Sequence, residues 1–217
     1  MVVVEERRSS AFKAVIFDMG GVMMTYHNCE DAIRVAYKLR KYSELVPIVK
    51  GLDIGKISTE ELSELVKSKV HDDEEVRAHF DRFTPDEIKK HMIPDKLFFD
   101  SLEPIRDSGM KTALLTNNFY MQKDRTTKVT IENAEALFDV VVESCVEGIS
   151  KPDRRIYELT LERLALPAEK CVFVDDLKEN CDAAEALGMT SVLVERGKSK
   201  EAISTIEDLI GCRLSLQ

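Results

Sequence analysis

Four short motifs in this chain have side chains that could bind a cation and an anion at one place. Asp18 and the adjacent pair Asp175–Asp176 each follow a short apolar run. Two neighbouring acids at a buried strand end repel each other unless a cation lies near them. Thr116 follows another such run, and Lys151 stands just before a proline and a helical pattern. A lysine close to a helix N-terminus is unfavourable unless an anion lies between its ammonium group and the exposed N–H groups.

Each motif taken singly has a plainer interpretation. Asp18 could form a turn or cap a helix, residues 116–118 could form a turn, and the acidic pair could be solvated. Lys151 could be an exposed loop residue. Their order along the chain, each at the expected end of a strand or helix, favours one shared site.

Five short apolar runs rich in β-branched residues predict the strands that must position these side chains. Runs of this kind, bounded by polar or glycine-containing segments, are typical of a parallel sheet covered by helices on both faces. Helical patterns follow at residues 153–165, with Pro152 at the first helical position, and at residues 178–187, with Gly188 as a C-cap. We predict an open α/β fold in which ligands bind at the carboxyl ends of the strands. The five runs are residues 14–17, 112–115, 140–142, 172–174 and 191–194.

Residues 25–97 have a different character, because they lack a valine and isoleucine run and are dense in charges and helix-forming residues. Ser58 followed by Glu61 predicts a capping box at the start of one helix. We therefore predict a core of residues 1–24 and 98–217, interrupted after its first strand by a helical segment. The helices expected in this segment are residues 30–42, 58–70, 72–81 and 85–91.

The overall composition argues against several classes of partner. The 217 residues include 31 lysines and arginines against 40 acids, and the net charge of −9 has the wrong sign for binding nucleic acid or an anionic membrane. No run approaches the roughly 18 apolar residues of a membrane helix, and residues 1–10 hold too short an apolar stretch for a signal sequence. The cysteines, odd in number and widely spaced, predict neither a disulfide framework nor a zinc site. We expect a cytoplasmic protein. The cysteines are Cys29, Cys145, Cys171, Cys181 and Cys212.

The motifs resemble those of the haloacid dehalogenase-like hydrolases, in which a nucleophilic Asp, a Thr or Ser, a Lys and a terminal acidic pair occur in this order. The segments FDMGGVM, LLTNN and VFVDDLKEN are also similar to the phosphatase domain at the N-terminus of soluble epoxide hydrolases and to the related domain fused to acyl-CoA dehydrogenases. This resemblance spans most of the chain. It implies a Rossmann-like core with an inserted helical cap, Mg²⁺ as cofactor and a small phosphorylated substrate.

The resemblance implies that Asp18 is the nucleophile and a metal ligand. The backbone carbonyl of Gly20 and the Asp176 side chain would be the other protein ligands of Mg²⁺. A carboxylate can attack phosphorus only when the repulsion between nucleophile and phosphate is neutralised, which Mg²⁺ and one ammonium group can do. The expected intermediate is an aspartyl-phosphate, which water then cleaves.

The remaining motif residues would bind phosphate or support the site. By the same resemblance, Thr116, Asn117 and Lys151 would hold phosphate oxygens, and Lys151 would also pair with the nucleophile. Asp175 would orient Lys151. Asn180 stands where many members have a further acid, and it could hydrogen-bond a metal-bound water.

One position departs from the family pattern. Phosphatases of the family usually have a second Asp two residues after the nucleophile, as general acid and then base, and here that position is Gly20. General acid–base help is worth about 10²- to 10⁴-fold in rate. We therefore expect a weak enzyme or one that prefers good leaving groups. Thr25, His27 and Glu30 could supply a substitute acid, or could be ordinary residues of the inserted segment.

Two other functions stay open at this stage. The chain could be a binding or interaction module that keeps the fold but has lost turnover, or a 2-haloacid dehalogenase, although the Asp-x-Tyr-Gly pattern of that branch is absent. The sequence does not name the substrate. Met23 and Met24 could line an apolar entrance or pack in the core. Because similar domains are fused to other enzymes, a homodimer is a further expectation.

Overall fold

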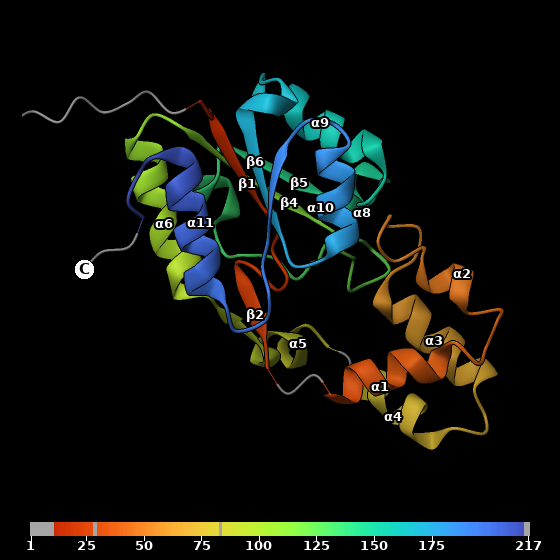
Figure 1. Ribbon diagram of the computed structural model, residues 1–217. Coiled ribbons are helices and arrows are strands. Elements are labelled where there is room, and N and C mark those ends of the chain that lie inside the picture. The colour runs from red at the N-terminus through yellow and green to blue at the C-terminus, as the bar shows by residue number, and fades with distance from the viewer. Residues whose placement is uncertain (1–10, 28–29, 83, 215–217) are drawn as a thin grey trace, which may run out of the picture.

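The computed structural model describes residues 11–27, 30–82 and 84–214 (Figure 1). Residues 1–10 and Cys29, both considered above, lie outside the described residues. The four other cysteines have free thiols. Across the described ranges, no helix is both long and apolar enough to cross a membrane.

A parallel sheet of five strands forms the centre of the molecule, in the order β5-β4-β1-β6-β7 (Figure 1). Each strand coincides with one of the five predicted apolar runs, so the predicted α/β, Rossmann-like fold is confirmed. The strands are β1 (Ala14–Phe17), β4 (Lys111–Thr116), β5 (Val140–Glu143), β6 (Cys171–Asp175) and β7 (Thr190–Leu193).

Helices cover both faces of this sheet. Successive strand residues point to opposite faces, so Val15 and Phe17 pack in the core under α6 (Lys96–Asp107) and α11 (Ser199–Ile210). Ala14 and Ile16 pack on the other side, under α9 (Arg154–Leu164) and α10 (Lys178–Glu185). Burial of β1 on both faces explains its unbroken apolar sequence. The remaining short elements of this part are α7 (Ala134–Leu137), α8 (Ser144–Glu147) and the 3₁₀ turn Ala168–Lys170.

The segment between the first and second sheet strands forms a helical unit with its own small core, which includes Leu45, Leu62, Val66 and Val76. The predicted capping box is present, because Glu61 N–H donates to Ser58 Oγ and Ser58 N–H donates to Glu61 Oε2. The predicted helix 85–91 has the expected bounds. The helices are α1 (Glu30–Leu39), α2 (Val46–Val49), α3 (Thr59–Lys69), α4 (Glu74–Arg82) and α5 (Pro85–His91).

A two-stranded antiparallel ribbon connects this helical unit to the sheet. It pairs β2 (Met24–Tyr26) with β3 (Met92–Pro94). The sequence analysis did not predict either strand, because neither has the continuous β-branched run that marks the sheet strands, nor the four-residue helix α2, which is too short to show a helical period. The ribbon brings the chain out of the sheet and back at almost the same place.

A second connection joins the helical unit to the loop that follows β4. The N–H groups of Thr59 and Glu60 donate to the carbonyls of Tyr120 and Met121, at 2.9 and 3.1 Å. Thr59 Oγ1 also donates to the Met121 carbonyl, at 2.9 Å. The start of α3 is thereby bonded to the loop that begins at Thr116 and Asn117.

Helix α9 starts at Arg154, two residues after the Pro152 that was expected to be its first residue. Its N-cap is Asp153, whose carboxylate accepts a hydrogen bond from Arg155 N–H at 3.0 Å, so Pro152 precedes the cap and is not the first helical residue. A carboxylate at this position accepts an otherwise unpaired helix N–H, which proline cannot do. Lys151 consequently lies in the preceding turn and its side chain can point away from the helix.

The Asp153 cap gives a prediction for stability. The Arg155 guanidinium and the Arg155 N–H both hydrogen-bond Asp153 and lower its pKa from 3.8 to about 2. Because the folded pKa is the lower one, this stabilisation is fully present above about pH 4 and is lost as the pH falls toward 2. At pH 7, Asp153→Ala should lower the free energy of unfolding by about 1 kcal/mol, measured by urea titration.

Asp153→Asn is the matched control, since asparagine also caps helices. It should retain most of the stability at pH 7, and its difference from the wild type should shrink as the pH falls from 4 to 2. Equal losses for the two variants at every pH would contradict the capping role.

Candidate active site

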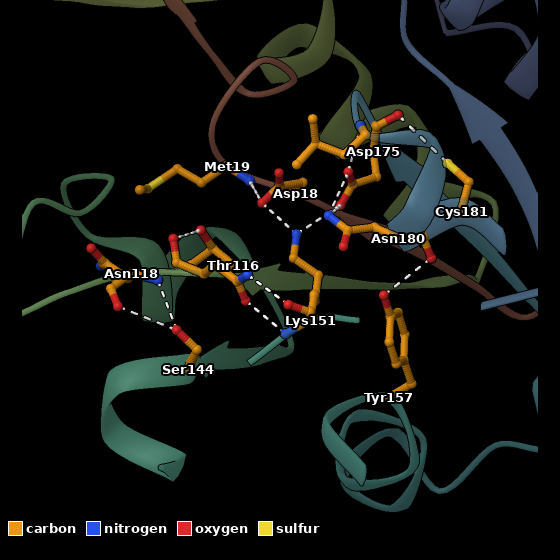
Figure 2. A network of polar contacts seen from close by, with 12 residues as sticks. Asp18, Met19, Thr116, Asn118, Ser144, Lys151, Tyr157, Asp175, Asn180 and Cys181 are labelled. Atoms are coloured by element: carbon orange, nitrogen blue, oxygen red, sulfur yellow. Dashed lines mark hydrogen bonds and ion pairs between the residues drawn. The ribbon is translucent and has the colours of Figure 1, made fainter. Parts of the chain in front are cut away.

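A buried lysine lies between two buried aspartates at the carboxyl edge of the sheet (Figure 2). Lys151 Nζ is 2.8 Å from Asp18 Oδ1 and 2.7 Å from Asp175 Oδ2. All three residues are less than a tenth exposed. The same ammonium group lies 5.7 Å from the ring centroid of Phe173, within the range of a cation–π contact.

The sheet topology brings the two aspartates together. Asp18 directly follows β1 and Asp175 ends β6, and these strands are neighbours in register. The Asp18 N–H donates to the Val174 carbonyl at 2.9 Å, which extends the pairing by one residue. Parallel neighbours end at the same edge, so two residues far apart in sequence meet there.

Asn117 positions the lysine main chain. Its side-chain oxygen accepts from Lys151 N–H at 2.8 Å, and its amide nitrogen donates to the Lys151 carbonyl at 3.0 Å. The two bonds fix Lys151 against the end of β4. The neighbouring Thr116 hydroxyl is buried and donates to the Asn117 carbonyl at 3.3 Å.

The Asp175 carboxylate has partners at both oxygens. Besides Lys151, it accepts from Leu177 N–H at 2.8 Å and from the Asn180 amide at 3.0 and 3.1 Å. Tyr157 Oη in turn donates to the Asn180 carbonyl at 3.1 Å. Asp175 is thus held rigidly and is in position to orient the lysine.

Asp18 and Asp176 keep oxygens that other groups could bind. Asp18 Oδ1 accepts from Met19 N–H at 2.6 Å and pairs with Lys151. In the part of the chain that the structure describes, Asp18 Oδ2 and both oxygens of Asp176 accept no hydrogen bond from another residue. Carboxylate oxygens of Asp18, Asp175 and Asp176 lie within 4.8 Å of one another. This donor set suits a hard divalent cation such as Mg²⁺.

The backbone beside Asp18 completes the oxygen-rich corner. Gly21 N–H donates to the Met24 carbonyl, and Met24 N–H donates to the Met19 carbonyl, both at 2.7 Å. The Gly20 carbonyl accepts no hydrogen bond from any described residue. Gly21 has a φ of +78°, and a Cβ there would lie 2.2 Å from Asp176 Oδ2. Only glycine allows the loop to approach the carboxylate this closely.

Burial and charge perturb three titratable groups of this cluster, Asp18, Asp176 and Lys151. Burial raises the pKa of Asp18, although Lys151 opposes the shift. Burial raises the pKa of Asp176 too, and the Asp175 charge adds to it. Burial by itself lowers the pKa of Lys151, but the two carboxylates outweigh it and raise that pKa. The lysine stays charged, and any further positive charge near the aspartates would stabilise their ionised forms.

A buried network that the sequence analysis missed lies beside Thr116. Ser144 Oγ accepts from Asn118 N–H at 2.9 Å, and the Asn118 amide donates to Glu143 Oε1 at 2.8 Å. Lys128 pairs with the other oxygen of Glu143. Glu143 and Ser144 follow the run 140–142. The rule that ligand residues follow strands could therefore have identified them as well.

A pocket of about 480 Å³ opens next to the aspartates, between the helical unit and the sheet edge. Met19 and Asn117, which contact Asp18 and Lys151 respectively, line its inner end. Much of the remaining wall is apolar, with side chains from α5 and from the loop after β4, including Ile88, Phe119 and Val129.

Several residues considered for this region lie elsewhere. Met23 is buried in the core and Met24 packs against it, so neither lines the pocket. Thr25 donates to the Ile93 carbonyl at 3.1 Å and contacts His27 Nε2 at 3.3 Å. Glu30 is exposed at the first position of α1. None of these five residues lines the pocket.

The buried triad gives a second prediction. Lys151→Met leaves Asp18 and Asp175 buried without their counter-charge, which should lower the free energy of unfolding by about 3–5 kcal/mol at pH 7. Lys178→Met, which removes an exposed lysine paired with Asp182, should cost less than about 1 kcal/mol. Chemical denaturation measures both.

A double variant keeps this test decisive if Lys151→Met does not fold. Adding Asp175→Asn removes one of the stranded charges and should recover part of the lost stability. A Lys151→Met protein as stable as Lys178→Met would show that the carboxylates do not depend on the ammonium group.

Two curated relatives match nearly the whole chain. Acyl-CoA dehydrogenase family member 10 of Mus musculus is 32% identical over 95% of this chain, but the chain spans only 20% of that protein's length. A sesquiterpene phosphatase of Aspergillus oryzae is 28% identical over 94% of this chain and 99% of its own length.

A solved structure has the same fold, and a family model identifies the family. A haloacid dehalogenase family enzyme of Bacteroides thetaiotaomicron, solved with magnesium and inorganic phosphate, superposes with a TM-score of 0.60 at 20% identity, over 86% of this chain and 96% of its own. The sequence model of haloacid dehalogenase-like hydrolases matches residues 12–188. With Asp18, Thr116, Lys151 and Asp175–Asp176 at one edge of a Rossmann-like sheet, this chain belongs to the haloacid dehalogenase-like hydrolases.

Proposed function

We propose that this protein is a Mg²⁺-dependent phosphatase of small phosphorylated substrates, with Asp18 as nucleophile. The observation that carries the proposal is the Asp18 carboxylate itself. It is buried, one oxygen is held by Met19 N–H and Lys151, and the other has no partner among the described residues. The name of the fungal relative, a sesquiterpene phosphatase, supports phosphate ester hydrolysis.

The proposed reaction begins with attack of Asp18 Oδ2 on phosphorus. The Lys151 ammonium, 2.8 Å from Asp18 Oδ1, offsets negative charge as nucleophile and phosphate approach each other. As this bond forms, the bond between phosphorus and the ester oxygen breaks and the organic group departs as an alcohol. Water then hydrolyses the resulting Asp18 acyl phosphate, which releases inorganic phosphate and regenerates the carboxylate. Asp175 and Asn180 act by holding Lys151 in place.

Asp18, Asp176 and the Gly20 carbonyl are the groups we assign as Mg²⁺ ligands. When bound there, the cation would supply positive charge toward the phosphate oxygens. The magnesium and inorganic phosphate in the Bacteroides structure support magnesium as the cation and phosphate as the ligand. We assign Thr116 and Asn117 to phosphate binding, Asn117 through its main-chain N–H because its side chain holds Lys151.

We further propose that residues 25–97 are a cap that selects the organic part of the substrate. The β2–β3 ribbon carries this segment out of the core and back, and its α5 side chains line the pocket beside Asp18. The apolar side chains Ile88, Phe119 and Val129 favour an apolar organic group. Glycine at position 20 favours esters with good leaving groups, because these need less protonation on departure.

The nucleophile assignment gives a direct test. Asp18→Asn should lower the Mg²⁺-dependent release of p-nitrophenol from p-nitrophenyl phosphate by about 10³-fold or more, the scale on which enzymes lose turnover without their nucleophile. EDTA should abolish the wild-type rate.

Asp182→Asn is the control, since it changes an exposed aspartate on α10, and should leave the rate unchanged. A wild-type protein that binds phosphate but releases no product would instead indicate a binding module of the same fold.

The apolar pocket gives another expected outcome. For n-alkyl phosphates, kcat/KM should rise about fourfold for each added CH₂ that the pocket buries, corresponding to about 0.8 kcal/mol. Ile88→Asp should flatten this dependence on chain length. Ile93→Asp, an exposed position that does not line the pocket, should not. A chain-length series that is flat in the wild type would contradict an apolar substrate.

A further inference from the structure

The side chain of Tyr26 occupies the space next to Gly20 where a side chain at position 20 would lie. A Cβ on Gly20 would be 2.3 Å from Tyr26 Oη and 3.0 Å from Tyr26 Cζ. The phenol hydroxyl therefore lies beside Gly20, the residue two positions after Asp18, in the space that a side chain at position 20 would fill.

The strand β2 explains why Tyr26, and neither of its neighbours, faces this place. Gly20 forms a bridge with Met24, and side chains at positions 24 and 26 of a strand lie on the same face. Thr25 lies on the opposite face and bonds the Ile93 carbonyl. Tyr26 pairs with Met92 in β3, which fixes its backbone.

Tyr26 also lines the pocket beside the nucleophile, together with Met19 and Asn117. Met19 donates its N–H to Asp18, and Asn117 holds Lys151. The Tyr26 side chain thus borders both the acid-free position 20 and the space that an organic group would fill. A phenol carries its proton at neutral pH and can both donate and accept a hydrogen bond.

Three other titratable side chains that line the pocket, Asp31, Glu87 and His79, are less suited to give up a proton. Asp31 is in an ion pair with Arg34, and the Lys90 ammonium beside Glu87 lowers the pKa of that carboxyl. Burial lowers the pKa of His79, which favours its neutral form.

We propose that Tyr26 Oη donates a proton to the departing oxygen in the phosphatase reaction proposed above, on which this assignment rests. As the Asp18 Oδ2–phosphorus bond forms, the bond between phosphorus and the ester oxygen breaks and its electron pair stays on that oxygen. The Tyr26 proton moves to this oxygen, which leaves as an alcohol. The Tyr26 phenolate then takes a proton from the water that attacks phosphorus, and inorganic phosphate and the Asp18 carboxylate are released.

Tyr26→Phe tests the assignment, because it removes the hydroxyl and keeps the ring. The rates are measured with Mg²⁺ on a series of phosphates that ends in an alkyl phosphate, a poor leaving group, and in acetyl phosphate, a good one. We expect kcat for the alkyl phosphate to fall about 10²-fold, within the usual range for loss of a general acid. For acetyl phosphate we expect a change of less than about threefold, because that leaving group departs without a proton.

Tyr37→Phe is the matched control, since it makes the same change at an exposed residue of α1. It should leave both rates unchanged. A Tyr26→Phe protein whose rates all stay at the wild-type level, or all fall by the same factor, would overturn the proton-donor role while leaving the phosphatase itself established. A wild-type protein that hydrolyses no phosphate of the series would overturn the proposed function, and the role of Tyr26 with it.

Discussion

The burial of one ammonium group between two carboxylates is the constraint on which the rest of this site depends. Lys151, Asp18 and Asp175 leave water almost completely, and each charge would be costly without the others. The two carboxylates also accept hydrogen bonds from main-chain N–H groups, and Asp175 accepts from the Asn180 amide. Asn117 holds the main chain of Lys151. The β1–β6 register and the turn before α9 must therefore be correct before the triad can form.

This cluster also reconciles an acidic protein with an anionic substrate. The chain has a net charge of −9, yet what a substrate meets is the local balance. Three aspartates against one lysine leave a local charge of −2. That balance suits a divalent cation, and with Mg²⁺ bound the proposed site would be neutral before phosphate arrives. The overall charge thus argues against nucleic acid as a partner, but it does not argue against a small phosphorylated substrate.

Sequence patterns predicted the parts of the molecule in which local signals and burial agree. The run Ala14–Phe17 is buried on both faces, and Ser58 with Glu61 forms the predicted cap. The patterns did not predict the contacts that depend on two distant segments. The Asn117 bonds to the Lys151 main chain and the approach of Tyr26 to Gly20 arise only once the sheet and the β2–β3 ribbon are in place. The site roles themselves rest on the resemblance, and their geometry rests on the fold.

The position of Tyr26 connects the chemistry of the core to the inserted segment. Three residues of β2 carry the chain from the nucleophile loop into the helical unit, and the side chain of one of them, Tyr26, lies against Gly20. An Asp at position 20 could not adopt this arrangement unless the Tyr26 ring moved, because a Cβ there would overlap the hydroxyl. Residues 20 and 26 are therefore coupled by space, and the proton donor enters the site with the same strand that begins the proposed cap. In this chain the choice of substrate and the protonation of its leaving group would depend on one short ribbon.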